Sequence, residues 1–288
     1  MPHQSPLVSV IITTYNRPLY LRLTINSVKN QTYENIEIIV VDDGTVGDEN
    51  LKICNSYEGI KYIKTHNTKT PASGRNLGFN NSNGSLIAFL DDDDLWIENK
   101  IAIQVSILLE NPDFGLVHSP CKVVNSDGLL QHEIIGESFK WRNKHGDVYM
   151  NMLGRFTLMM PTPLLRKELV EKVGLFNEIM LPAGEDVEFW TRCSFETKFY
   201  YYDQPLAVYR VHSKNLSLNK KAYIDLPLYL KKILVKQKGK NRISSEEYNL
   251  LLKICVKMQW QHKKDNFFRT LFNMFLIDYL FFVKFKKS

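Results

Sequence analysis

The chain has 288 residues, of which 44% are hydrophobic and 24% are charged, and this composition excludes a disordered or fibrous protein. The length suits one large α/β domain with an appendage, or two smaller domains. The net charge of +6 is uneven, because residues 223–288 carry 14 Lys+Arg against 5 Asp+Glu, which leaves residues 1–222 at −3 and predicts an anionic partner for the C-terminal part.

Strands alternate with helices over the first 124 residues. The alternation is read from β-branched apolar runs that end in turn residues and from apolar residues at helical spacing. The predicted strands are residues 7–14, 36–41, 60–64, 85–90 and 114–124, and the predicted helices are residues 18–31, 73–82 and 99–110. The alternation favours an α/β fold with a mainly parallel central sheet and helices on both of its faces.

The pattern weakens between residues 125 and 160, where only a hairpin turn within 126–133 is indicated. Farther along, helices are expected over 163–174, which Gly174 closes, and over 184–195. Residues 198–213 are strand-like, and the chain after residue 222 is predicted to be helical and basic.

Three of the predicted strands end in loops rich in oxygen atoms, with the sequences TTYN, DDG and DDDD. Ligands of parallel α/β sheets bind at the carboxyl ends of the strands. One such loop could be an ordinary solvated turn, but three at one edge of a sheet indicate a binding site.

The run FLDDDDLW places Asp91, Asp92, Asp93 and Asp94 directly after an apolar strand. One aspartate could cap the helix that follows, but four are too many for that use. Carboxylates are the ligands that Mg²⁺ and Mn²⁺ prefer, and Mg²⁺ often uses one or two of them together with substrate phosphates. The run therefore predicts a divalent metal site beside a phosphate-bearing substrate. No GxxxxGK[ST] or GxGxxG loop accompanies it, which argues against kinase-type and dinucleotide-binding enzymes.

Three segments, taken together and in order, carry a family resemblance: VSVIITTYNRPLYLRLTINSVKNQTYENIEIIVVDDGT, GRNLGFNNSNGSLIAFLDDDDLW and GEDVEFW. Over roughly residues 7–218 the chain resembles the family 2 glycosyltransferases of the GT-A fold. The resemblance implies an inverting transfer of a sugar from a nucleotide donor, usually a UDP-sugar, to an acceptor hydroxyl. We accordingly expect a catalytic domain over residues 1–222 and a basic, aromatic-rich helical extension over 223–288.

The resemblance also implies a role for individual residues. The donor base is expected to stack on Tyr15 and to donate to Asp43, with Thr13 and Arg75 also at the nucleotide and Asp92 at the ribose. Asp91 and Asp93 resemble the metal-binding DxD pair, with Asp93 in direct contact with Mn²⁺ or Mg²⁺, and His212 faces the metal and the diphosphate.

The catalytic base is expected in the motif GED, as Asp186 or its neighbour Glu185. A base of this kind takes the proton of the acceptor hydroxyl and must be separate from the metal carboxylates, since a metal-bound carboxylate is a poor base. Either acid could instead only favour the start of a helix through the helix dipole. The sequence leaves the choice between the two carboxylates open.

Two other functions compete with a hexosyl- or N-acetylhexosaminyltransferase of envelope glycan synthesis, such as capsule or lipopolysaccharide. A sugar nucleotidyltransferase would need a glycine-rich basic loop after the first strand, where TTYNRP has no glycine. A non-catalytic nucleotide-sugar-binding assembly subunit would not need a base in GED. The identity of the donor sugar, the acceptor and the oligomeric state are not encoded in any pattern that we recognise.

The location of the protein is predicted from its cysteines and its two ends. The four cysteines form no CxxC pair, which is typical of a reducing compartment, and the N-terminus has no signal-peptide pattern, so that we expect a cytoplasmic protein. The apolar stretch 271–283 is shorter than the ~20 residues of a membrane span. With Lys284, Lys286 and Lys287 it predicts either a helix packed on protein or one that lies on the inner face of an anionic membrane. Aromatic residues do not alternate with the basic ones there, so that we expect no nucleic-acid partner.

Overall fold

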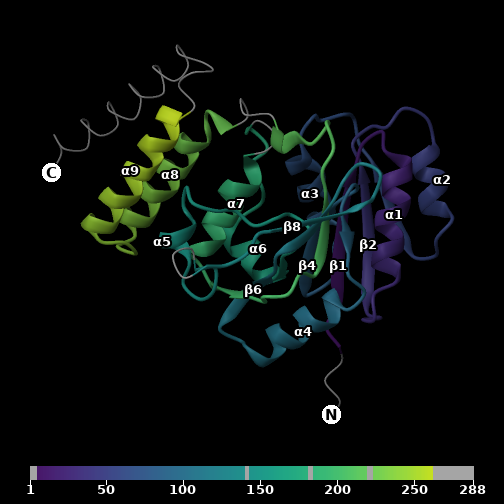
Figure 1. Ribbon diagram of the computed structural model, residues 1–288, viewed down its shortest axis with the longest axis horizontal. Helices are drawn as coiled ribbons and strands as arrows, with labels where there is room; N and C mark the ends of the chain where they lie inside the picture. Colours follow the sequence, from purple (N-terminus) through teal and green to yellow (C-terminus); the bar gives the residue numbers. More distant parts are fainter. Residues whose placement is uncertain (1–4, 140–142, 181–183, 219–222, 262–288) are drawn as a thin grey trace.

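The computed structural model describes residues 5–139, 143–180, 184–218 and 223–261. The described chain forms a seven-stranded sheet with helices on both faces and a four-stranded sheet beside it (Figure 1). The predicted α/β class is confirmed.

The larger sheet is mixed but mainly parallel. In spatial order its strands are β10 (Lys198–Tyr201), β6 (Phe114–His118), β9 (Leu164–Arg166), β4 (Leu86–Asp91), β1 (Val8–Thr14), β2 (Ile36–Asp42) and β3 (Ile60–Lys64). Only β9 runs antiparallel to its neighbours, β4 and β6. The parallel strands β1, β2 and β4 therefore bring the ends of TTYN, DDG and DDDD to one edge, as the sequence predicts.

Successive side chains of β1 point to opposite faces of the sheet, so the core has two layers. Val8, Val10 and Ile12 pack toward one face, whereas Ile11 packs toward the other. The first face is covered by helices α1 (Pro18–Lys29), α2 (Glu49–Asn55) and α4 (Lys100–Glu110). The second is covered by α3 (Pro71–Asn80), α6 (Lys167–Val173) and α7 (Glu185–Ser194). Because these strands are buried on both faces, their sequences are almost uniformly apolar.

A glycine allows α3 to lie close to the sheet. A Cβ atom on Gly78 would lie 2.3 Å from Cγ2 of Ile11, so that no larger residue fits without a shift of the helix or strand. This close approach fixes the helix that carries Arg75 one turn earlier, over the end of β1.

Two segments that the sequence predicts as continuous strands are divided between the sheets. The predicted strand 114–124 breaks at Ser119–Pro120 into β6 and β7 (Cys121–Val124), and residues 198–213 form β10 and β11 (Ala207–Arg210). The two segments pass from the larger sheet to the smaller one side by side, since β10 pairs with β6 and β11 with β7, both in parallel. The order of the smaller sheet is β5 (Leu95–Trp96), β11, β7 and β8 (Leu130–Ile135). The predicted hairpin is its β7–β8 pair.

The C-terminal helices pack beside α7 (Figure 1). Helices α8 (Leu226–Gly239) and α9 (Ser245–Gln261) share an apolar cluster with the short helix α5 (Tyr149–Met152), and the remaining helical turn is η1 (Leu216–Leu218). None of the helices in the described residues is long and apolar enough to cross a membrane. The domain boundary at residue 222 stays a prediction.

Candidate active site

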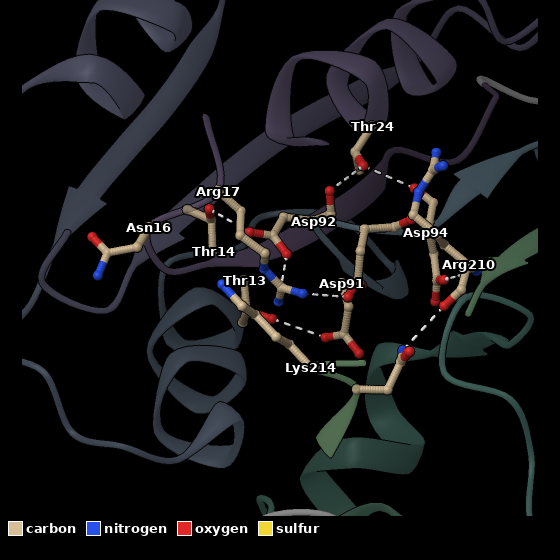
Figure 2. A network of polar contacts seen from close by, with 12 residues as sticks. Thr13, Thr14, Asn16, Arg17, Thr24, Asp91, Asp92, Asp94, Arg210 and Lys214 are labelled. Atoms are coloured by element: carbon tan, nitrogen blue, oxygen red, sulfur yellow. Dashed lines mark hydrogen bonds and ion pairs between the residues drawn. The ribbon is translucent and has the colours of Figure 1, made fainter. Parts of the chain in front are cut away.

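The four aspartates occupy the turn that follows β4, next to the end of β1. The hydroxyl of Thr13 donates to Asp91 Oδ1 over 3.0 Å, and that of Thr14 donates to Asp92 Oδ2 over 2.6 Å. The hydroxyl of Thr24 donates to the backbone carbonyls of Asp92 and Asp94 (Figure 2). Hydroxyls of β1 and α1 thus hold the acidic turn in place.

Three arginines from distant parts of the chain offset the negative charge of this turn. Arg75 of α3 lies 2.8 Å from Asp91 Oδ1, and Arg17 of the β1–α1 loop pairs with both Asp92 and Asp93. Arg210 of β11 donates from Nε to the carbonyl of Asp93. These contacts explain how the chain tolerates four consecutive aspartates.

The aspartates differ in protonation. Burial alone would raise the pKa of Asp91, but the charge of Arg75 and the Thr13 hydroxyl hold it below its ordinary value. Burial raises the pKa of Asp94 well above the usual range, and the neighbouring Asp93 raises it further. Asp91 is therefore ionised, whereas Asp94 serves as a buried acceptor for the backbone N–H of Arg210 at 3.0 Å.

The loops after β1 and β2 carry the residues expected at the donor base. Tyr15 is partly exposed, and its hydroxyl accepts a hydrogen bond from Asn67. Asp43 accepts from the backbone N–H groups of Thr68 and Lys69, at 2.7 and 3.1 Å. Asp43 therefore already organises the loop before α3, and it retains acceptor capacity on Oδ2.

The two acids of the GED motif have different surroundings. Glu185 is buried, with Oε1 2.9 Å from Nη1 of Arg75 and Oε2 accepting from the Gly184 N–H. Asp186 accepts one hydrogen bond, from the Val187 N–H to Oδ1. Burial and then the charge of Glu185 raise the pKa of Asp186 to about 7, against the opposing charge of Arg75. Asp186 is thus the carboxylate suited to exchange a proton near neutral pH.

One cavity of about 650 Å³ unites most of the predicted residues. The predicted residues that line it are Thr13, Tyr15, Asp43, Arg75, Asp91, Asp93, Glu185 and Asp186. His212 lies beside it, with Nε2 2.9 Å from Asp93 Oδ2. Asp92 is fully buried behind the wall, where Thr14 and Arg17 take up its two oxygens, and it is not among the described lining residues. Its contact with a ribose stays a prediction that would need a rearrangement of this turn.

The acidic turn offers few ligands for a divalent ion. No group of three or more His, Cys, Asp or Glu side chains in the described residues could hold a metal by itself. Asp93 Oδ1 has no partner within the described ranges, and Asp91 is ionised and borders the same cavity. Two carboxylates fit an ion such as Mg²⁺ that completes its coordination with water and substrate phosphates.

The cavity also contains residues that the sequence analysis does not single out. They are Asn16, Arg17, Asn67, residues 157–160, Tyr209, Lys214 and Tyr223, among others. Arg17 could have been found, because it is the basic residue of the polar loop TTYNRP at the end of the first strand. No sequence pattern at residues 157–160 (TLMM) indicates a binding site.

Comparison with known sequences places the chain among glycosyltransferases. The sequence model described as glycosyl transferase family 2 matches residues 9–172. An uncharacterized glycosyltransferase of Rickettsia bellii is 34% identical over 214 residues, which are 72% of this chain and 29% of that protein. The chain spans 29–44% of the length of the first three curated relatives. Over a shorter part, 43% of this chain and 49% of the relative, it is 34% identical to the Escherichia coli UDP-Glc:alpha-D-GlcNAc-diphosphoundecaprenol beta-1,3-glucosyltransferase WfgD.

Solved structures agree with this assignment at the level of the fold. The S. aureus TarS 1–349 structure in complex with UDP-GlcNAc has a TM-score of 0.71 at 18% identity, covering 91% of this chain and 75% of that one. The mannosyltransferase PcManGT of Pyrobaculum calidifontis, in complex with GDP-Man and Mn²⁺, has a TM-score of 0.59 at 14% identity, covering 91% and 74%. With a GT-A architecture and a family match over more than half of its length, the chain belongs to glycosyl transferase family 2.

Proposed function

We propose that the protein transfers a sugar from a nucleotide-sugar, with a UDP-sugar as the first candidate, to an acceptor hydroxyl with inversion at the anomeric carbon. The observation that carries this proposal is that one cavity is lined by Asp91 and Asp93 and also by Asp186, whose pKa is raised to about 7. The UDP-GlcNAc and GDP-Man bound by TarS and PcManGT support a nucleotide-sugar as the donor.

In this proposal the loops after β1 and β2 bind the nucleotide. Tyr15 stacks on the base, and Asp43 accepts from its ring N–H through the less occupied Oδ2. Thr13 and Arg75 act through Asp91, since both of their side chains donate to its carboxylate. Arg75 accordingly influences the nucleotide site through its contact with Asp91.

The reaction needs charge stabilisation on the leaving diphosphate and a base for the incoming hydroxyl. A bound Mn²⁺ or Mg²⁺ would supply the former as a Lewis acid, and Asp91 and Asp93 are the residues that would hold it. Asp186 Oδ2, which accepts no hydrogen bond from another described residue, takes the proton of the acceptor hydroxyl. Glu185 is committed to Arg75 and positions the start of α7.

For the acceptor, we propose a saccharide of a growing envelope glycan, carried on a lipid diphosphate. The name of WfgD, which specifies a diphosphoundecaprenol-linked acceptor and UDP-Glc, supports this class. The transferred unit is then a hexose or an N-acetylhexosamine.

The function is tested by a screen of UDP- and GDP-sugars for Mn²⁺-dependent release of nucleoside diphosphate. With the active donor, Asp93→Ala should lower the rate of nucleoside diphosphate release on the order of 10²-fold, as expected when transition-state charge stabilisation is removed. Asp113→Ala is the matched control, because Asp113 is exposed on another part of the surface, 3.7 Å from Lys198, and should keep the full rate. The proposed use of the ion would be contradicted if Asp93→Ala and Asp113→Ala released nucleoside diphosphate at the same rate. It would also be contradicted if wild type kept its full rate in the presence of a chelator.

We further propose that the extension, residues 223–288, binds an anionic membrane surface from the cytoplasmic side. The predicted apolar segment 271–283 and its lysines lie outside the described residues, so the support comes from α8. Lys232 and Lys236 of α8, and Lys240 directly after its last residue, are exposed at intervals of four residues, which aligns them along one side of the helix.

Co-sedimentation with phosphatidylglycerol vesicles checks this membrane proposal. At ~1 kcal/mol for each lysine near an anionic surface, replacing all three by glutamine should lower vesicle binding on the order of 10²-fold. Phosphatidylcholine vesicles provide the uncharged control. Unchanged binding of the triple variant to phosphatidylglycerol would remove α8 from the interface.

A further inference from the structure

Arg17 contacts two of the four aspartates of the acidic turn. It immediately precedes α1, and its guanidinium reaches into the acidic turn (Figure 2). Nη2 lies 2.7 Å from Asp92 Oδ1, and Nη1 pairs with Asp93 Oδ2. The charge of both aspartates helps to raise the pKa of Arg17 despite its burial, so that it is always a cation.

A second donor contacts the same oxygen of Asp93. Nε2 of His212 lies 2.9 Å from Asp93 Oδ2 and 3.4 Å from Nη1 of Arg17. Nδ1 of His212 accepts a hydrogen bond from the Lys214 backbone N–H at 3.1 Å, so that the neutral ring carries its proton on Nε2 and donates it to Asp93. In this tautomer His212 has no lone pair to offer a metal through Nε2.

The two arms of the Arg17 fork differ in their surroundings. Asp92 is fully buried and also bonded to Thr14, so the Arg17–Asp92 pair is an internal anchor. Asp93 borders the cavity, and the Arg17 side chain is 31% exposed. Nη1 of Arg17 can therefore exchange Asp93 for another acceptor while Nη2 stays paired with Asp92.

We propose that Arg17 and His212 form a latch on Asp93 that keeps a free divalent ion out until a nucleoside diphosphate is present. This inference rests on the proposed function. Phosphate oxygens are strong acceptors for a guanidinium and an imidazole N–H, so the diphosphate gives both donors an alternative partner. The released carboxylate then holds the ion together with the phosphates. The ion therefore binds tightly only together with the nucleotide or after it.

Binding of Mn²⁺, measured by titration calorimetry and by the free-Mn²⁺ electron paramagnetic resonance signal, tests the latch without any turnover. Wild type should bind Mn²⁺ weakly alone and roughly tenfold or more tightly with saturating UDP or GDP, which is the size of a typical coupling between sites. Arg17→Gln should bind Mn²⁺ alone roughly fivefold to tenfold more tightly than wild type, because a competing positive charge is gone. The increase in Mn²⁺ affinity that nucleotide causes should be correspondingly smaller in Arg17→Gln than in wild type.

Arg17→Gln leaves Asp92 without its counter-ion, so a second variant guards against loss of the fold. Arg17→Lys keeps a cation near Asp92 but has one ammonium group and no planar fork, so it too should bind Mn²⁺ alone more tightly than wild type. Arg22→Gln, at an exposed position of α1, is the matched control and should behave as wild type. Circular dichroism verifies that each variant is folded.

The outcomes separate the latch from the function beneath it. Wild type that binds nucleotide, but holds Mn²⁺ equally well with and without it, would overturn the latch alone. So would folded Arg17 variants whose affinity for Mn²⁺ matches that of Arg22→Gln. Failure of wild type to bind either nucleotide would instead overturn the proposed function, and the latch with it.

Discussion

Asp186→Asn is expected to lower the rate of sugar transfer on the order of 10²–10⁴-fold, the contribution of a positioned general base. The substitution preserves the size of the side chain and removes its basicity. Because Asp186 makes no hydrogen bond or ion pair with the described residues of the nucleotide-binding loops, the affinity for the donor should change little. Single-turnover transfer and donor binding, measured on the same preparation, separate the two effects.

The pH profile provides the specific signature of this carboxylate. Burial and the charge of Glu185 raise the pKa of Asp186 to about 7, so the basic form accumulates as the pH rises through 7. Wild-type kcat/KM should therefore increase across this range and level off above it, and Asp186→Asn should lose this limb. Asp113→Asn is the control and should retain both the rate and the limb. Persistence of the limb in Asp186→Asn would assign the base to another group.

Much of the larger sheet could be predicted because its strands are buried on both faces. The apolar runs of β1, β2 and β4 need no partner information to be recognised as strands, and their parallel pairing places Asp43 and Asp91 at the same edge. The polar residues that end these strands could be predicted for the same reason. The proposed choice of Asp186 over Glu185 could not be made from the sequence, since it depends on the contact between Arg75 and Glu185.

The errors of the sequence analysis have different physical causes, most of which are not visible in the local pattern. The predicted helix 163–174 begins as the strand β9, because Leu165 pairs with both β4 and β6 and Leu164 pairs with β6. Helix α2 was missed since it is short and buries only a few residues, among them Ile53 and Cys54. The split of the predicted strand 114–124 is the exception, because the proline in HSPC was a visible sign.

The ion pairs of the site were equally hidden from the sequence. Arg17 and Asp93 are 76 residues apart, and Arg75 and Glu185 are 110 residues apart. Nothing in the spacing of these residues links them, and only the folded sheet brings β1, α3, β4 and α7 together. The acids mark the site in the sequence, whereas the ion pairs that offset their charge become visible only in the structure.

Arg75→Met is expected to destabilise the protein by about 3–5 kcal/mol, the usual cost of removing one partner from a buried ion pair. Arg75 is 3% exposed and joins Asp91, at the end of β4, to Glu185, at the start of α7. Methionine fills a similar volume but leaves two carboxylates without a counter-ion. At about 2–4 °C per kcal/mol, the midpoint of thermal unfolding should fall by about 6–20 °C.

Arg242→Met tests whether burial is the cause of that loss. Arg242 also pairs with a glutamate, Glu196, but it is 37% exposed, and such pairs contribute about 0–1 kcal/mol. A comparable loss in the two variants would mean that Arg75 stabilises the fold no more than a surface residue does. Arg75→Lys should fall between Met and wild type, because a single ammonium neutralises charge but cannot contact Asp91 and Glu185 with two separate arms. That ranking would identify Arg75 as the residue that joins the acidic turn to α7, the helix of the proposed catalytic base.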